Sequence, residues 1–138
     1  MKTKLMKPLP LKTVPVTKMD INHFFKALHK AGFFARQSYW CCNTCGCAAL
    51  EKDLKPKHRG WVFYNRQDAS AFRSRRYDWK IILLDDLYLT FGDTKGNMNV
   101  TKRIGREVEV IALRCGLSVD WNGDPQTRIR IHHEKVDL

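Results

Sequence analysis

The sequence has no apolar run long enough to cross a membrane. Its longest one, from Trp79 to Leu84, is interrupted by Lys80, and a membrane-spanning helix needs about 20 such residues. Near the lysine-rich start, Pro8, Pro10 and Pro15 prevent the apolar segment of a signal peptide. We therefore expect a cytoplasmic protein in a thiol-reducing setting, with no membrane partner.

Acidic residues are scarce. The 138-residue chain has 14 of them against 25 lysines and arginines, a formal net charge of +11. The excess lies in residues 1–18, which contain no acid, and in residues 52–80, whereas residues 81–138 are nearly balanced. Such asymmetry suits a polyanionic partner such as nucleic acid, a nucleotide or an acidic protein face, and a role in solubility alone is the alternative.

The motifs of common enzymes are also missing. The sequence has no glycine-rich phosphate loop, no Ser/His/Asp order and no helical His-Glu metal motif. Asp85 and Asp86 are adjacent, and neighbouring residues of a strand point to opposite faces, so the pair would not share a metal ion or a proton. We therefore do not expect an enzyme.

The length suits a single domain with its own core. Lysines and prolines in residues 1–18 predict a basic, flexible arm, and residues 19–138 are expected to form the domain. Apolar residues at helical spacing predict helices over residues 20–32, with Asp20 as N-cap, and over residues 104–116. A shorter helix is expected after Gly46.

Extended segments separate these helices. Residues 61–64 and 81–91 are rich in strand-forming residues, and residues 117–121 and 128–132 alternate at period two around a turn. The pattern predicts an α+β fold, in which an antiparallel sheet of about four strands has its helices packed on one face.

Four of the five cysteines lie between Cys41 and Cys47. The spacing Cys42-x-x-Cys45 is that of a zinc knuckle, and Cys41 is a candidate third ligand. A complete zinc site needs further ligands, which folding would have to bring from Cys47 or from the histidines at 58, 132 and 133. Zinc is therefore the one cofactor that the sequence suggests.

Two other interpretations of the cysteines remain open. The start of a helix lowers the pKa of a thiol, which suits redox chemistry, but the spacing does not match that of thioredoxins. Free cysteine also packs as a small hydrophobe. We favour this last interpretation, in which the cluster is a buried turn that opens a helix, and keep zinc as the alternative.

Basic and aromatic residues alternate in the middle of the chain. Guanidinium groups pair with phosphates and aromatic rings stack on bases, so a mixture that includes Trp61, Tyr64, Tyr77 and Trp79 suits a nucleotide or a single strand. By alternation, the outward face of the last strand adds three basic groups. The candidate anion-binding residues are Arg66, Arg73, Arg75, Arg76, Lys80, Arg128, Arg130 and His132.

Several blocks in combination resemble a family of uncharacterised bacterial proteins. They comprise a Cys-Cys-x-x-Cys-Gly block at 41–46, a Gly-aromatic strand at 60–64, a Leu-Tyr-Leu strand at 87–92, and a closing helix and hairpin at 104–108, 116–123 and 127–129. The resemblance covers residues 20–132, implies the same fold and transfers no activity; Cys47 lies outside its cysteine block. The short, lysine-rich organisation also resembles proteins that bacteriophages encode.

These observations support three hypotheses of function. The first is a non-enzymatic protein that holds nucleic acid or a nucleotide on its arginine-rich surface. The second is an inhibitor or adaptor, phage-encoded, that docks on an acidic face of a host protein. The third is a structural zinc protein or a thiol protein.

Overall fold

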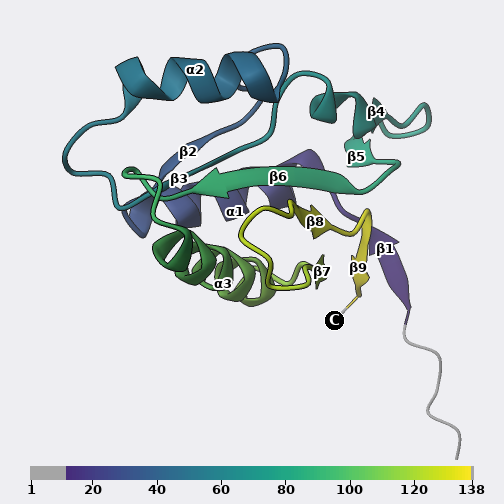
Figure 1. The fold of residues 1–138 in the computed structure, drawn as a ribbon. Helices are drawn as coiled ribbons and strands as arrows, with labels where there is room; N and C mark the ends of the chain where they lie inside the picture. The colour runs from purple at the N-terminus through teal and green to yellow at the C-terminus, as the bar shows by residue number, and fades with distance from the viewer. Residues whose placement is uncertain (1–11, 138) are drawn as a thin grey trace, which may run out of the picture.

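The structure is a computed structural model that describes residues 12–137, and these fold as a mixed α+β domain (Figure 1). Within this range, three α-helices and a short 3₁₀ helix (η1) accompany nine strands. In chain order the elements are β1 (Thr13–Pro15), α1 (Lys18–Lys30), β2 (Phe34–Arg36), α2 (Asn43–Asp53), β3 (Trp61–Phe63), η1 (Asp68–Ala71), β4 (Phe72–Ser74), β5 (Ile81–Leu83), β6 (Leu87–Gly92), α3 (Met98–Arg114), β7 (Val119–Asp120), β8 (Ile129–Ile131) and β9 (Glu134–Val136).

The central sheet has five strands in the order β2-β3-β6-β8-β7. β2 and β3 run parallel, and the other neighbours are antiparallel. The prediction of about four antiparallel strands is therefore wrong, although the α+β class is confirmed. The reason is the long connection between β2 and β3, which contains α2: such a crossover is what a parallel pair requires.

Helices cover both faces of this sheet, so the prediction of one covered face is also wrong. α1 and α3 lie against one face, and α2 lies over the other (Figure 1). Phe63 and Phe34 pack with Leu50 of α2, whereas Val62 and Ala35, their neighbours, belong to the main core. Strands that are apolar on both faces need a layer on each side.

The N-terminal part of the domain begins earlier than expected. β1 pairs with β9, Thr13 opposite Val136, and Val16 is completely buried. Thr17, not Asp20, is the N-cap of α1; Asp20 completes the capping box three residues later. Residues 12–18 are therefore part of the fold, and residues 1–11 of the predicted arm lie outside the described residues.

The two predicted amphipathic helices are confirmed. In α1 the buried residues are Ile21, Phe24, Phe25 and Leu28, and Gly32 at φ +98° ends the helix. α3 buries Ile104, Val108 and Ala112. None of the helices within residues 12–137 is long and apolar enough to cross a membrane.

Candidate functional site

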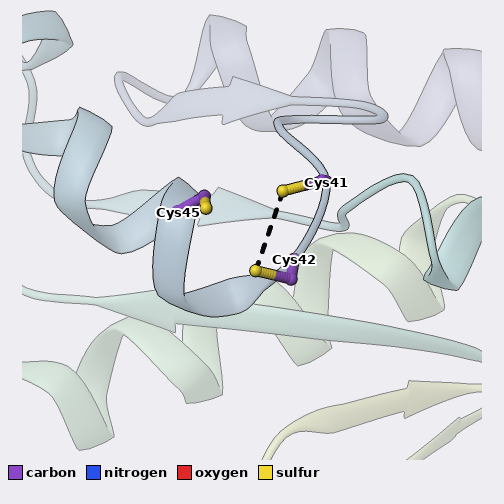
Figure 2. A group of neighbouring side chains, drawn as sticks. All are labelled: Cys41, Cys42 and Cys45. Atoms are coloured by element: carbon purple, nitrogen blue, oxygen red, sulfur yellow. Dashed lines mark hydrogen bonds between the residues drawn. The ribbon is translucent and has the colours of Figure 1, made fainter.

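The cysteine cluster opens α2 at the end of a tight loop. Cys42 is the N-cap, Cys41 precedes it, and Cys45 lies in the first turn (Figure 2). Their three sulfur atoms lie within 4.8 Å of one another, and the Sγ atoms of Cys41 and Cys42 are 3.8 Å apart. The structure thus brings together the three cysteines that the sequence nominated as metal ligands.

The prediction that these cysteines are buried is wrong. Cys41 and Cys47 are exposed, and Cys42 is half-buried. The helix turns a different side to the sheet: Gly46 and Leu50 are its buried residues. A glycine between the cysteines allows the helix to lie close to Phe63, and the thiols are left facing outward.

The thiols influence one another's protonation. Hydrogen bonds lower the pKa of Cys42. The largest effect comes from the backbone N–H of Cys45, and smaller ones come from the thiols of Cys45 and Cys41. Hydrogen bonding to Cys41 and Cys42 raises the pKa of Cys45 to about 11. The start of α2 therefore favours the thiolate form at Cys42, and the neighbouring thiols stabilise it by hydrogen bonding.

The second candidate region is the hairpin formed by β4 and β5, residues 72–83, which we call the basic hairpin. Phe72 lies opposite Leu83 and Ser74 opposite Ile81. At its tip the side chains of Tyr77 and Trp79 are 80% and 75% exposed. Exposed aromatic side chains that gather at one tip, in contrast to single scattered ones, indicate a candidate interaction site.

Internal contacts hold the tip of the basic hairpin in shape. Arg75 pairs with Asp78 and lies over the ring of Tyr77, 4.9 Å from its centroid. Asp78 also accepts a hydrogen bond from the backbone N–H of Lys80 at 3.1 Å. The backbone N–H of Trp79 donates to the carbonyl of Arg75 at 2.8 Å. Arg75 is thus a structural residue of the turn as well as a cation.

The remaining cations near the hairpin have no carboxylate partner among residues 12–137. Arg73 donates to the carbonyls of Ser70 and Phe72 and keeps its charge uncompensated. Arg66, Arg76 and Lys80 are exposed. This part of the predicted surface therefore presents free positive charge.

Arg128 behaves differently, because a carboxylate neutralises it. Its guanidinium donates to both oxygens of Asp68, at 3.0 and 2.6 Å, and to the carbonyl of Tyr88 at 2.8 Å. Asp68 begins η1, the short helix that leads into the basic hairpin. The residue that precedes β8 and the short helix before the basic hairpin therefore meet, but the contact uses the charge of Arg128.

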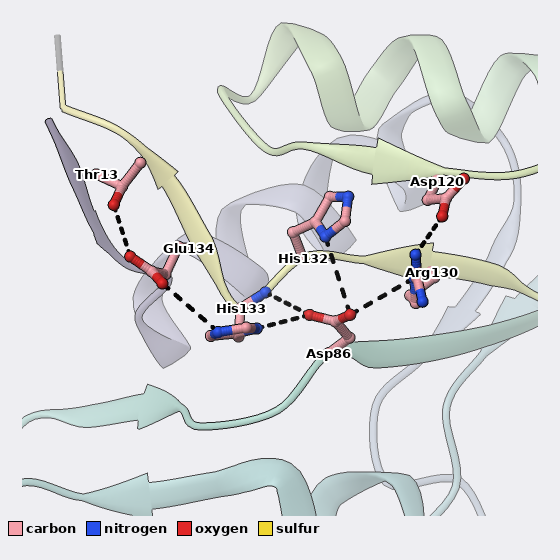
Figure 3. A network of polar contacts seen from close by, with 7 residues as sticks. All are labelled: Thr13, Asp86, Asp120, Arg130, His132, His133 and Glu134. Atoms are coloured by element: carbon pink, nitrogen blue, oxygen red, sulfur yellow. Dashed lines mark hydrogen bonds and ion pairs between the residues drawn. The ribbon is translucent and has the colours of Figure 1, made fainter. Parts of the chain in front are cut away.

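Arg130 and His132 belong to a network around Asp86 (Figure 3). Arg130 pairs with Asp120 on β7 and lies 3.5 Å from Asp86. The ring of His132 lies 3.9 Å from Asp86, and that of His133 lies 2.7 Å from it. These contacts join the end of β8 to the start of β6 and leave little free charge for an anion.

Sequence reasoning missed these carboxylates. Asp68 and Asp86 are far from the arginines along the chain, and no spacing rule links them. Asp120 lies opposite Arg130 in the predicted hairpin, so the cross-strand register could have identified that pair. The alternation of β8 did give the correct face: Arg128 and Arg130 line one hollow of about 240 Å³, together with Tyr88 and Trp121. The balanced charge of residues 81–138 was the available signal that these arginines have partners.

Comparisons with known proteins identify the family. Neither the curated proteins nor the solved structures include one that matches this chain significantly. Residues 16–136, nearly the whole described domain, match a domain of unknown function, DUF6891. The match starts at Val16, the first completely buried residue of the fold. On this match, the chain belongs to the DUF6891 family.

Proposed function

We propose that this protein binds single-stranded nucleic acid through the basic hairpin. One observation carries the proposal: Tyr77 and Trp79 protrude from the tip of the hairpin beside the exposed cations Arg76 and Lys80. Exposed aromatic rings offer stacking platforms for bases, and neighbouring cations bind the phosphates between them.

The energetics support a nucleic-acid strand over a small anion. Stacking of one base on an aromatic side chain contributes about 1–3 kcal/mol, and every base has a face to stack. Each phosphate that a lysine or arginine neutralises releases counterions and adds affinity at low salt. A mobile, solvent-exposed cation gains little from a single anion, so the repeated charges of a strand suit this surface better.

The proposed surface includes fewer residues than the eight anion-binding candidates that the sequence predicted. Arg66, Arg73, Arg76 and Lys80 supply free charge, while Arg75 supports the turn. Arg128, Arg130 and His132 are engaged with carboxylates and are assigned a structural role. The proposed setting is the thiol-reducing cytoplasm, which suits the five free cysteines of the described chain.

The test is binding of a fluorescent single-stranded oligonucleotide, followed by anisotropy over a series of salt concentrations. The variant Arg73→Glu/Arg76→Glu/Lys80→Glu should bind more weakly and show a shallower dependence on salt. A matched control reverses three exposed lysines elsewhere: Lys26→Glu/Lys57→Glu/Lys102→Glu. Absence of binding at low salt, or an equal loss in both variants, would reject the proposal.

A protein partner is the second candidate function. Along β5 and just after it, Ile81 and Leu84 are 47% and 53% exposed, and β4 has no second neighbour among the described strands. An open edge strand beside apolar side chains is suited to pairing with a strand of another protein. This favours the inhibitor or adaptor hypothesis, with an acidic host protein as the partner.

A pull-down with and without nuclease separates the two candidates. A partner that stays bound after nuclease treatment, and that is lost on Ile81→Glu, would support the adaptor. Loss of every partner on nuclease treatment would support nucleic-acid binding and reject the adaptor.

A further inference from the structure

Three thiols converge on one point beside α2, from a loop and from the first turn of a helix (Figure 2). The Sγ atoms of Cys41, Cys42 and Cys45 all lie within 4.8 Å of one another. Two thiolates bound to one tetrahedral zinc ion, with Zn–S bonds of about 2.3 Å, lie about 3.8 Å apart. The Cys41–Cys42 separation is 3.8 Å. One pair of sulfur atoms is therefore already at the separation of two zinc ligands, and the other two separations exceed it by at most about 1 Å.

The loop that holds these thiols is fixed by its surroundings. Ser38 and Trp40 adopt positive φ angles of 50° and 61°, a conformation that non-glycine residues rarely take. Backbone hydrogen bonds fix this loop to the segment after β3: Tyr39 donates to Tyr64 at 2.8 Å, and Arg66 donates to Trp40 at 2.9 Å. Strained backbone that the fold holds in place is characteristic of functional sites.

The opposite side of the cluster is equally constrained. The ring of Tyr39 is buried against Phe34 and Phe63, and its hydroxyl donates to Asp53 near the end of α2. Both the loop and the helix are thus fixed to the same small core. The thiols are held in place from both sides before any ligand arrives.

We propose that Cys41, Cys42 and Cys45 bind one zinc ion as three thiolates, with a fourth position open to solvent. Thiolate ligands select zinc, copper(I) or iron–sulfur clusters, and the cluster types generally need four thiolates. Zinc accepts three protein ligands and completes its tetrahedron with water. Cys47 is not part of the convergent group, and the exposed Cys41 leaves the site accessible.

Binding replaces the protons of the three thiols with the ion, so it should become weaker as the pH falls. The site lies at the N-terminus of α2, whose positive dipole end stabilises the single negative charge that zinc and three thiolates carry together. A water molecule or an incoming thiol would occupy the open position, as in zinc sites that exchange a ligand.

The decisive experiment uses the full chain, purified in a reductant without chelator and loaded with zinc alone. Elemental analysis should find one zinc per chain, and cobalt(II) in its place should show the absorption of tetrahedral thiolate coordination. Each of the variants Cys41→Ser, Cys42→Ser and Cys45→Ser should raise the zinc dissociation constant by more than about 100-fold, beyond the loss typical of changes to residues that only support a metal ligand. The matched variant Cys47→Ser should keep the zinc.

Alkylation mapped by mass spectrometry provides a test that needs no variant. Zinc should protect Cys41, Cys42 and Cys45 from iodoacetamide and leave Cys47 reactive. Equal alkylation of all four with and without zinc, or loss of zinc in Cys47→Ser, would overturn the proposal. Neither measurement uses nucleic acid, so the result is independent of the function proposed for the basic hairpin.

Discussion

Asp86 accepts two hydrogen bonds from His133. The backbone N–H of His133 lies 3.0 Å from Oδ1 of Asp86, and the ring Nδ1 of His133 lies 2.7 Å from the same oxygen. This contact fixes the corner where β8 turns into β9, the strand that holds β1 (Figure 3). The pairing of β1 with β9 therefore depends on two titratable residues, Asp86 and His133.

The pair should make stability depend on pH. Hydrogen bonding to Asp86 raises the pKa of His133. Burial raises the pKa of Asp86, but the hydrogen bonds from His133 outweigh it and the pKa is lowered overall. The histidine contribution is complete below about pH 6.5 and is lost above it; the aspartate contribution is complete above about pH 4 and is lost below it.

We therefore expect Asp86→Asn to lower the free energy of unfolding most between about pH 4 and pH 6.5, by about 1 kcal/mol, because the pair is partly exposed. Chemical denaturation across this range measures the difference, and an NMR titration should show the pKa of His133 falling. Asp85→Asn is the control, since Asp85 acts on His133 only as a more distant charge. A difference that grows above pH 8 would contradict this assignment.

Arg128 should stabilise the domain through Asp68. The carboxylate is largely buried and also accepts a hydrogen bond from the N–H of Asn65 at 3.0 Å. Arg128→Met keeps the aliphatic part of the side chain but leaves the Asp68 carboxylate without its cationic partner. We therefore expect the free energy of unfolding to fall by about 2 kcal/mol, less than for a fully buried pair. Arg76→Met, whose guanidinium has no carboxylate partner among the described residues, should change stability little.

A double-mutant cycle with Asp68→Asn separates the ion pair from other effects. The double variant should lose less stability than the sum of the two single variants, with a coupling free energy of about 1–2 kcal/mol. Additive losses would show that Arg128 acts through packing on Tyr88, over whose ring it lies at 5.7 Å.

Gly46 should resist replacement even though it lies in a helix. Alanine in place of an interior glycine normally stabilises a helix by about 1 kcal/mol. Here an added Cβ would lie 2.9 Å from Cζ of the completely buried Phe63, whose ring packs against those of Tyr39 and Trp61. Gly46→Ala should therefore lower the free energy of unfolding by about 1–3 kcal/mol, measured by thermal or chemical unfolding.

The control for this prediction is Cys47→Ala, because Cys47 is exposed on the same helix; its effect should be near zero. A stabilised Gly46→Ala would contradict the close packing of α2 on Phe63. Since Gly46 follows Cys45 directly, the displaced helix should also bind zinc more weakly.

The sequence predicted those elements whose information is local. Apolar residues at helical spacing placed Phe24 and Val108 in the core, and alternation around the Asn122–Pro125 turn gave the β7–β8 pair. Pairing of distant strands was not predictable in this way. The contact of Thr13 with Val136 joins the two ends of the domain, and such short strands carry no pattern that names their partner.

The candidate site shows the same division. The spacing of Cys42 and Cys45 indicated which thiols would meet, because it lies within one helical turn. Whether they would face the core or the solvent depended on Phe63, a residue of β3, and the prediction that they are buried is wrong. The charges of Arg128 and Arg130 were placed on the correct face, but their carboxylate partners come from other elements.

The two aromatic residues at the hairpin tip provide the sharpest test of the nucleic-acid proposal. Trp79→Ala and Tyr77→Ala should each weaken binding of a single strand by about 1–3 kcal/mol, roughly 5- to 150-fold in the dissociation constant, through loss of stacking. Stability should change little, since both rings are mostly exposed. Trp40→Ala is a matched control, because Trp40 is half exposed and lies outside the hairpin.

Unlike the charge-reversal variant, the alanine variants should leave the salt dependence of binding intact, because they remove no phosphate contact. If both alanine variants bind as the parent does while the charge-reversal variant does not, the hairpin attracts polyanions by charge alone and the stacking role is wrong.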